Sequence, residues 1–452
     1  MKPDLGKLTI LIKIFLMTKV PGIIIASPNS SAGKTMITLG LLRAFKKRGI
    51  NIQPFKNGPD YIDPGFHKYA CGRNSYNLDT WAMSESLMNQ LHFNSLGSNL
   101  IITEGSMGFY DGVSKKGVSG KGMTAELSEK FGWPLVLVLN VSGQAQSATA
   151  IALGFAKFKK NIKLGGVILN FVASKRHEAL IKKSMRQEGI EVLGSIPRKK
   201  KAELEKRHLG LIQADEIVDL EKNIEYYSNL VNQHVDIEKI KSLARSKKVC
   251  VEKKYRIGTP GQKIAIASDK AFSFIYPHLI DNWKKAGSEI LPFSPLNNEA
   301  PDKSANFIWL PGGYPELYGK VLSNANNTKE ALRKLSKNIR IHGECGGYMT
   351  LGKWLIDENG VKHKMFGLLG LTTSFQKRSL HLGYRTAKVK NKSINYINSM
   401  TVRGHEYHYT TVISQPDKKL YDVFDANGKK VEETGSYKGN VSGTFFHLIS
   451  RS

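Results

Sequence analysis

A phosphate-binding loop is the first chemistry that the sequence predicts. Residues 27–35 read SPNSSAGKT, directly after the apolar run 22–26 and at the start of a helical pattern that spans 34–48. Backbone N–H groups at a helix N-terminus bind phosphate oxygens, a lysine adds positive charge, and a threonine hydroxyl binds Mg²⁺. Pro28 stands where the strict form of this loop has a glycine, so the spacing alone is a partial match. We expect a nucleotide site at Ser30, Ala32, Gly33, Lys34 and Thr35.

Carboxylates that could join a magnesium ion to these phosphates follow two further strand candidates. Asp60 and Asp63 come just after the run 51–55, and Glu104 directly follows the run 100–103. Open parallel sheets bind ligands at the carboxyl ends of their strands, and phosphate-bound Mg²⁺ takes one or two carboxylates. A turn-forming or capping role is the alternative for any one of them. Their shared position favours a metal site beside the loop.

A nucleophilic cysteine is the second chemistry that the sequence predicts. Residues 340–348 read RIHGECGGY, and a turn between a strand and a helix exposes a nucleophile, here Cys345. The N-terminus of the following helix is expected to lower the pKa of the thiol. His447, in the run VSGTFFH, is the candidate base. The loop PGGYPE at 311–316 is the candidate source of an oxyanion N–H donor.

The run RGHEYHY at 403–409 invites a metal-binding interpretation, which its spacing disfavours. His405 and His408 are three residues apart, and on a strand this places the two imidazoles on opposite faces. The pattern also differs from the helical H-E-x-x-H of zinc proteases. A structural or interdomain role is therefore favoured.

Two α/β domains must position these groups. Apolar runs alternate with helical patterns, which predicts βαβ units and a parallel sheet. We expect a P-loop-type domain over 17–245, a linker over 246–262 that carries Gly258, Pro260 and Gly261, and a second α/β domain over 263–452. The predicted strands are 22–26, 51–55, 100–103, 135–140, 165–170 and 191–196 in the first domain, then 263–268, 289–293, 307–310, 339–342, 383–389 and 401–408.

Charge and cysteine content limit the classes of function that the sequence allows. The 452 residues carry a formal net charge of +29, which attracts an anionic partner, although lysine runs such as 157–163 are typical of a solvated surface. These runs lack the interleaved aromatics of a nucleic-acid groove, so no nucleic-acid partner is expected. Three distant cysteines exclude a disulfide framework and indicate a reducing, cytoplasmic compartment. Residues 1–16 are expected to be an extension or a misassigned start, and no membrane partner is predicted.

The sequence resembles the cobyrinic acid a,c-diamide synthase family from about residue 17 to residue 447. The resemblance rests on the runs KNGPDYIDPGFH (56–67), NLDTWAM (77–83), EGSMGFYDG (104–112), SGQAQSATAIALGF (142–155) and KRHLGL (206–211). It implies that Lys34 and Thr35 bind ATP and magnesium, and that Asp60 and Glu104 complete the metal site. Lys56 would steady the transferred phosphoryl group, and Asp63 and Asp111 would shape the side that binds the corrinoid. Asn140 departs from the aspartate of the family at that strand end.

The second half resembles class I glutamine amidotransferases of the cobyrinate and cobyrate synthase type. The resemblance implies that Cys345 forms a γ-glutamyl thioester, that His447 activates it, and that Gly313 and Gly346 supply oxyanion N–H groups. Ile449 stands where the usual triad has a glutamate, as is familiar in this subfamily. The implied reaction amidates the a and c acetates of cobyrinic or hydrogenobyrinic acid with ATP and L-glutamine. It would pass through an acyl phosphate and channelled ammonia, in a chain that could form a homodimer.

Two alternatives remain from the sequence. A related amidoligase, such as a cobyric acid synthase or an enzyme that amidates a nickel sirohydrochlorin, shares both predicted sites. The runs GPDYIDP and NLDTWAM favour the a,c-diamide family over cobyric acid synthase. A P-loop partition ATPase that binds DNA would use the basic surface, but it would leave Cys345 and His447 unexplained.

Overall fold

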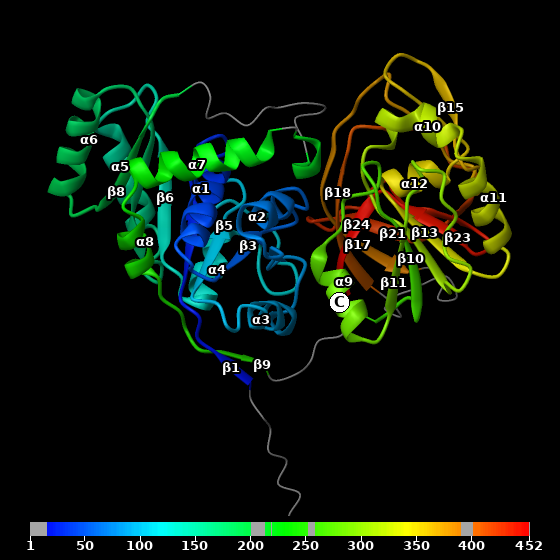
Figure 1. Cartoon of the computed structure of the whole chain (residues 1–452), viewed down its shortest axis with the longest axis horizontal. Helices are drawn as coiled ribbons and strands as arrows, with labels where there is room; N and C mark the ends of the chain where they lie inside the picture. Colours follow the sequence, from blue (N-terminus) through cyan, green and yellow to red (C-terminus); the bar gives the residue numbers. More distant parts are fainter. Residues whose placement is uncertain (1–15, 200–212, 218, 252–257, 390–400, 452) are drawn as a thin grey trace, which may run out of the picture.

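The computed structural model describes residues 16–199, 213–217, 219–251, 258–389 and 401–451. The chain forms two lobes (Figure 1), the first built by residues up to 251 and the second by residues from 258 onward. The family run at 206–211 lies outside the described residues. No helix in the described ranges is long and apolar enough to cross a membrane.

The first lobe holds a seven-stranded sheet in which every neighbouring pair is parallel. Its strand order is β4-β3-β5-β2-β6-β7-β8. The apolar sequences of these strands are buried on both faces, as parallel sheets require. The strands are β2 (Gly22–Ala26), β3 (Ile52–Asn57), β4 (Tyr76–Leu78), β5 (Leu100–Glu104), β6 (Leu135–Asn140), β7 (Leu164–Val172) and β8 (Val192–Pro197).

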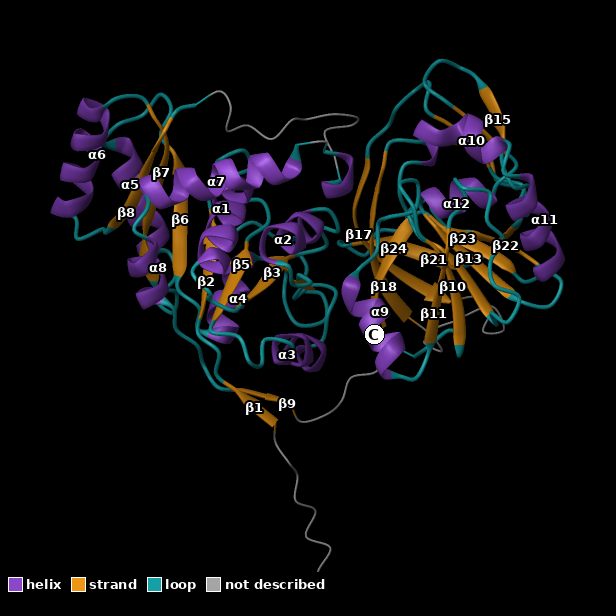
Figure 2. Ribbon diagram, in the orientation of Figure 1, coloured by secondary structure: helices purple, strands orange, loops and turns teal. Residues whose placement is uncertain are grey.

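Helices cover both faces of this sheet (Figure 2). Side chains of β2 alternate between two cores, with Ile23 and Ile25 in one and Ile24 and Ala26 in the other. Gly40 lets two helices approach closely, because a Cβ there would lie 2.7 Å from the Tyr227 carbonyl oxygen. The helices are α1 (Lys34–Lys47), α2 (Asp63–Cys71), α3 (Glu85–Phe93), α4 (Thr124–Phe131), α5 (Ser147–Lys157), α6 (Lys175–Gln187), α7 (Leu220–His234) and α8 (Ile237–Leu243).

The second lobe also has a seven-stranded sheet, ordered β11-β10-β12-β13-β23-β22-β20. Its first five strands are parallel and its last two are antiparallel. The strands are β10 (Lys263–Ala267), β11 (Glu289–Phe293), β12 (Phe307–Leu310), β13 (Arg340–Glu344), β20 (Lys418–Lys419), β22 (Ser436–Lys438) and β23 (Val441–Thr444). The helices are α9 (Pro277–Lys285), α10 (Gly319–Ser323), α11 (Asn326–Leu335) and α12 (Gly346–Leu351), with a 3₁₀ turn at Pro315–Tyr318.

Two smaller sheets complete the second lobe. An antiparallel sheet of β17 (His381–Val389), β18 (Thr401–His408), β21 (Tyr421–Asp425) and β24 (Phe446–Arg451) carries His447. The other sheet joins β14 (Trp354–Ile356), β15 (Lys362–Lys364), β16 (Thr372–Ser374) and β19 (Thr411–Ser414).

The lobes contact each other through buried side chains. The Tyr276 hydroxyl donates to the Pro59 carbonyl at 2.7 Å, and the Tyr76 hydroxyl donates to Asp281 of α9 at 2.6 Å. The Trp81 ring stacks on Tyr384 of β17 with centroids 4.3 Å apart. Strand β4 and the loops that follow β3 and β4 therefore contact the second lobe.

The segment predicted as a linker contains a strand. β9 (Val249–Val251) lies within residues 246–262 and pairs antiparallel with β1 (Leu16–Thr18), below the first lobe in Figure 1. Leu16, placed in the predicted extension, therefore belongs to an ordered strand. The sequence missed this pairing because its partners are more than 200 residues apart and each strand has three residues.

Candidate active sites

The loop between β2 and α1 is held by its lysine and by a distant asparagine. The Lys34 ammonium donates to the Ser27 hydroxyl at 2.8 Å and to the carbonyls of Asn29 and Met107 at 3.1 and 2.7 Å. Asn170 lies in β7, at the end of the strand predicted over 165–170, and its amide donates to the Ala32 carbonyl at 2.9 Å. The loop therefore wraps around a charged ammonium, next to the start of α1, as a phosphate site requires.

A positive backbone φ marks two positions of this loop. Ser31 has φ 64° and Gly33 has φ 89°. A Cβ on Gly33 would lie 2.2 Å from the Asn170 amide nitrogen, so glycine is needed there for the close approach. Ser30 and Ala32 lie in the same turn, with Ala32 buried and Ser30 exposed.

The pH dependence of ATP binding is the first expected consequence. Burial lowers the pKa of Lys34 to about 8, although the charge of Glu104 opposes this effect. Because the protonated ammonium attracts phosphate, the Kd for ATP is expected to rise about tenfold for each pH unit above 8. Calorimetry between about pH 7 and about pH 9.5 measures this slope. Lys34→Arg is the matched control, since a guanidinium stays charged and the slope should vanish. A flat wild-type profile would contradict a role of Lys34 in binding phosphate.

Glu104 is the centre of a buried network at the carboxyl end of β5. One carboxylate oxygen accepts from the Thr35 hydroxyl at 2.7 Å and lies 3.1 Å from the Lys56 ammonium. The other oxygen bonds the His67 imidazole at 2.8 Å. The fully buried glutamate thus joins the phosphate loop, β3 and α2.

Lys56 gathers two further carboxylates. Its ammonium lies 3.5 Å from Asp60 and forms a short ion pair with Asp63. Burial opposes the charge of Lys56, but Asp63, Glu104 and Asp60 together raise its pKa well above the ordinary value. Burial and the neighbouring Asp60 raise the pKa of Asp63. Lys56 and the carboxylates of Asp60, Asp63 and Glu104 thus share one site. The Lys56 ammonium can exchange one of these carboxylate partners for a phosphate oxygen.

The oxygen ligands at this site fit a magnesium ion. Mg²⁺ in phosphate sites keeps several waters and is bound by hard oxygen ligands, including one or two carboxylates. The Thr35 hydroxyl and the Glu104 carboxylate already lie within hydrogen-bond distance, and Asp60 approaches the ammonium that Glu104 contacts. These residues can therefore hold the ion beside the loop.

The two aspartates predicted for the corrinoid side lie in different places. Asp63 belongs to the buried Lys56 cluster, whereas exposed Asp111 lines a cavity of about 730 Å³ between the lobes and accepts from the Gly108 N–H at 2.9 Å. The cavity is also lined by Lys121, Arg385 and His405. Asp111 therefore faces the space between the lobes, and Asp63 faces the phosphate side.

Cys345 occupies a strained turn, as the sequence predicted. The residue has φ 46° and ψ −106° between β13 and α12, a conformation that costs free energy for a non-glycine residue. A Cβ on Gly346 would lie 2.9 Å from the Gly313 nitrogen, so the two predicted oxyanion segments are in backbone contact. Gly313 and Gly346 are thereby brought together beside Cys345.

The predicted lowering of the thiol pKa is wrong for this conformation. Burial and the nearby Glu316 carboxylate raise the pKa of Cys345 well above its usual range, and the Gly346 N–H only partly opposes this shift. The sequence argument considered the helix N-terminus alone. It could not include the burial of the thiol, which lies 3.9 Å from the Tyr407 carbonyl.

His447 lies near the oxyanion loop and carries a neutral imidazole. A Cβ on Gly312 would lie 2.2 Å from its Cε1 atom, so the ring packs against that loop. Burial and the neighbouring His405 lower the pKa of His447 to about 3. Within the described ranges neither ring nitrogen has a hydrogen-bond partner, and no bond joins it to Cys345. The neutral imidazole thus keeps a lone pair that no described group occupies in this conformation.

Tyr61 connects the two sites. Its ring lies 4.6 Å from the His447 ring and 4.5 Å from Phe274, measured between centroids. Asp60, the preceding residue, approaches Lys56 in the phosphate cluster. One loop after β3 therefore contacts both chemical centres.

Comparisons with known proteins agree with this arrangement. The model of the CobQ/CobB/MinD/ParA nucleotide-binding domain matches residues 23–212, and that of the CobB/CobQ-like glutamine amidotransferase domain matches residues 263–452. A protein of Rhodobacter capsulatus named hydrogenobyrinate a,c-diamide synthase is 50% identical over 95% of this chain and 98% of its own length. A protein of the same name from Agrobacterium fabrum is 42% identical over 95% of this chain and 98% of its own length.

The chain belongs to the hydrogenobyrinate a,c-diamide synthase family. The resemblance and the fold class predicted from the sequence are confirmed, because a nucleotide-binding α/β domain precedes a glutamine amidotransferase domain. The chain is accordingly an amide-forming ligase that uses ATP and glutamine. A partition ATPase does not account for the second domain match.

Two residues of the site were missed by the sequence analysis although both lie in the first family run. His67 binds Glu104, and Tyr61 covers His447. Their place within KNGPDYIDPGFH was the available signal. Their roles depend on contacts with β5 and β24, which the sequence could not supply.

Loss of the Tyr61 ring is expected to uncouple the two sites of this diamide synthase family member. Tyr61→Ala opens space beside His447, so ammonia should escape and the ratio of glutamate to amide formed should rise several-fold. Tyr61→Phe is the matched control, because the buried hydroxyl has no hydrogen-bond partner among the described residues. Glutamate and amidated product are quantified in the same reaction. An unchanged ratio in Tyr61→Ala would remove Tyr61 from the ammonia route.

Proposed function

We propose that this chain amidates the a and c acetate carboxylates of hydrogenobyrinic acid, with ATP as the activating substrate and glutamine as the nitrogen donor. The observation that carries the proposal is the loop after β3, where Asp60 approaches the phosphate cluster and Tyr61 packs on His447. The names and near-complete coverage of the relatives support the corrinoid substrate.

Ammonia is released at Cys345. The thiol loses its proton to His447, and the sulfur attacks the carboxamide carbon of glutamine. The N–H groups of Gly313 and Gly346 stabilise the oxyanion. The C–N bond then breaks, the leaving nitrogen takes the proton from His447, and ammonia departs from a γ-glutamyl thioester. Water hydrolyses the thioester to glutamate and restores the thiol.

The acceptor carboxylate is activated at the phosphate cluster. A carboxylate oxygen of the corrinoid attacks the γ-phosphorus of ATP, the bond to the bridging oxygen breaks, and an acyl phosphate and ADP result. Lys34 and Lys56 stabilise the transferred phosphoryl charge. Thr35, Glu104 and Asp60 would hold a magnesium ion, which would supply positive charge to the phosphates. Ammonia then attacks the acyl carbon and displaces phosphate.

The cavity between the lobes is the proposed corrinoid site. Its volume of about 730 Å³, next to Ser106 and Met107 of the phosphate side, can admit part of a tetrapyrrole. Lys121 supplies positive charge for the other carboxylates of the substrate, and Arg385 and Asp111 also line the cavity. This charge pattern is consistent with the net charge of +29.

Mass spectrometry tests the substrate directly. The protein is incubated with ATP, Mg²⁺ and glutamine, and with hydrogenobyrinic acid or cobyrinic acid in parallel. A doubly amidated product from hydrogenobyrinic acid is expected. Amidation of cobyrinic acid alone would assign a cobalt-containing substrate. Intact glutamine hydrolysis without amidation of either acid would contradict the proposal and direct attention to another tetrapyrrole.

A further inference from the structure

A small pocket around the nucleophile contains a histidine that the proposed mechanism does not use. Cys345, Gly313, Tyr407 and His408 line this pocket together with Glu316 and Met349. It holds both the attacking sulfur and an oxyanion glycine, so the glutamine carboxamide must react here. His408 is therefore placed beside the reacting end of the substrate.

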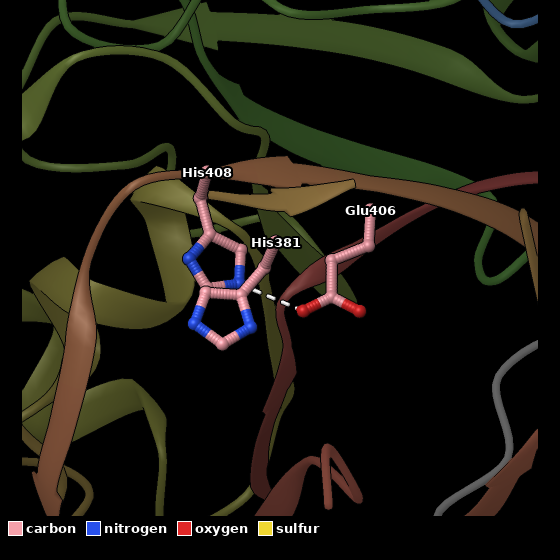
Figure 3. A group of neighbouring side chains, drawn as sticks. All are labelled: His381, Glu406 and His408. Carbon is pink, nitrogen blue, oxygen red and sulfur yellow. Dashed lines mark hydrogen bonds and ion pairs between the residues drawn. The ribbon is translucent and has the colours of Figure 1, made fainter. Parts of the chain in front are cut away.

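The hydrogen bond of His408 identifies which of its ring nitrogens is left without a partner. Its Nε2 lies 2.8 Å from the Glu406 carboxylate (Figure 3). Burial alone would raise the pKa of Glu406, but the hydrogen bond from His408 and the ion pair with Arg385 lower it to about 2. An ionised carboxylate only accepts hydrogen bonds, so Nε2 carries a proton, and in the neutral imidazole the lone pair is then on Nδ1.

That lone pair is buried without a partner. His408 is 7% exposed and Glu406 is 2% exposed. Among the described residues, His408 Nδ1 has no hydrogen-bond partner. A buried unsatisfied acceptor is unfavourable, and a ligand with an N–H donor can satisfy it.

A metal ion is a weaker interpretation of the same cluster. The ligand atoms of His381, Glu406 and His408 lie within 4.8 Å of one another. However, Arg385 forms an ion pair with the second oxygen of Glu406, and the rings of His381 and His408 are stacked in parallel with centroids 4.7 Å apart. The charge of the carboxylate is thus already balanced, and the hydrogen bond to His408 accounts for its orientation.

We propose that His408 Nδ1 accepts a hydrogen bond from the carboxamide NH₂ of glutamine, and that Glu406 is the positioning residue that fixes the required tautomer. This inference rests on the proposed glutamine hydrolysis at Cys345. The pair would also select substrate over product. Glutamate has a γ-carboxylate without N–H donors, so its oxygens would face the acceptor Nδ1 of His408, which favours product release.

His408→Gln tests the contact by comparing glutamine with glutamate. The KM for glutamine is expected to rise roughly tenfold to a hundredfold, as for loss of one buried hydrogen bond. The inhibition constant for glutamate should stay constant or fall, because the new side chain can also donate. The rate with free ammonia should be unchanged, which reports on folding and on the synthetase site.

Glu406→Gln tests the tautomer. Arg385 donates to the oxygen of the residue at 406, so the new amide NH₂ would face His408 Nε2 and make it an acceptor. The proton would move to Nδ1, which then donates. The ratio of the KM for glutamine to the inhibition constant for glutamate is expected to rise by at least about tenfold, so that preference shifts toward glutamate. His363→Gln is the matched control, because His363 also bonds a carboxylate, Asp357 at 2.8 Å, but does not line this pocket.

Three outcomes would overturn the inference. An equal rise in the KM for glutamine and in the inhibition constant for glutamate would mean that His408 contacts the α-ammonium group, which the two molecules share. A fall in kcat at constant KM would make His408 a proton-transfer group, and unchanged kinetics would make it structural. Failure of the underlying function is distinguishable, since glutamine would then support amidation in Cys345→Ala. If His408→Gln also loses the ammonia rate, Glu406→Gln decides the question.

Discussion

Cys345→Ala is expected to abolish amidation with glutamine while amidation with free ammonia continues. Removal of a catalytic nucleophile typically lowers kcat by at least about a thousandfold. In the proposed mechanism the acceptor carboxylate is activated in the other lobe, so added ammonia should still reach it. Initial rates with each nitrogen donor, measured at saturating ATP and corrinoid, give the comparison.

Cys250→Ala is the matched control for this variant. Cys250 is half-buried in β9, below the first lobe, and lies in neither predicted site. It should leave both rates unchanged. Persistent glutamine-dependent amidation in Cys345→Ala would contradict the assignment of the nucleophile, and loss of both rates would indicate that Cys345 also supports the synthetase lobe.

Glu104→Gln is expected to produce the opposite pattern. The substitution keeps the size of the side chain but removes the charge that holds Lys56, Thr35 and His67 around the phosphate site. Amidation should fall by about a hundredfold to a thousandfold with either nitrogen donor, as for loss of a preorganised electrostatic group. Basal glutamine hydrolysis at Cys345 should remain. Parallel assays of amide and glutamate formation separate these effects.

Glu85→Gln is the control for the loss of a carboxylate. Glu85 is largely exposed at the start of α3 and pairs weakly with Lys130 at 3.4 Å. It should be neutral because exposed ion pairs contribute little to stability. If Glu104→Gln impaired only the glutamine-dependent rate, the placement of ATP and magnesium at Glu104 would be wrong.

Much of the sheet architecture could be predicted from local pattern. The predicted strands 22–26, 135–140, 289–293, 307–310 and 401–408 coincide with β2, β6, β11, β12 and β18. The apolar residues of β2, β6 and β12 are buried on both faces, and burial in β18 alternates in period two, so in these strands the pattern directly reports the fold. Short strands such as β4 and β14 were missed, because three residues carry too little periodicity.

The separate parts of the site were also predictable, but their coupling was not. Motifs indicated Lys34 and Cys345 because each lies at a turn between a strand and a helix. The contact between the Tyr61 and His447 rings joins a loop of the first domain to strand β24 of the second, almost 390 residues apart, and no local pattern encodes it. The spacing argument correctly placed His405 and His408 on opposite faces of β18. Burial alternates along this strand, and the two rings contact different residues of β17, Tyr384 and His381 respectively. It gave no sign of Glu406 as a partner of His408.

The thiol pKa shows a second limit of sequence reasoning. The helix that follows Cys345 was visible in the sequence, but the carboxylates of Glu316 and Glu406 come from other segments. Burial and these charges outweigh the N–H of Gly346. Long-range electrostatics therefore reversed a prediction that local geometry supported.

Transfer of labelled nitrogen tests the central claim that one chain couples Cys345 to the phosphate cluster. The protein is supplied with ATP, hydrogenobyrinic acid and glutamine labelled with ¹⁵N at the carboxamide, in the presence of unlabelled ammonia. The product amides are then examined by mass spectrometry. Labelled amides are expected, because the proposed route takes ammonia from Cys345 past Tyr61 without mixing with solvent. Amides that carry the unlabelled nitrogen of the solution would contradict the coupled mechanism.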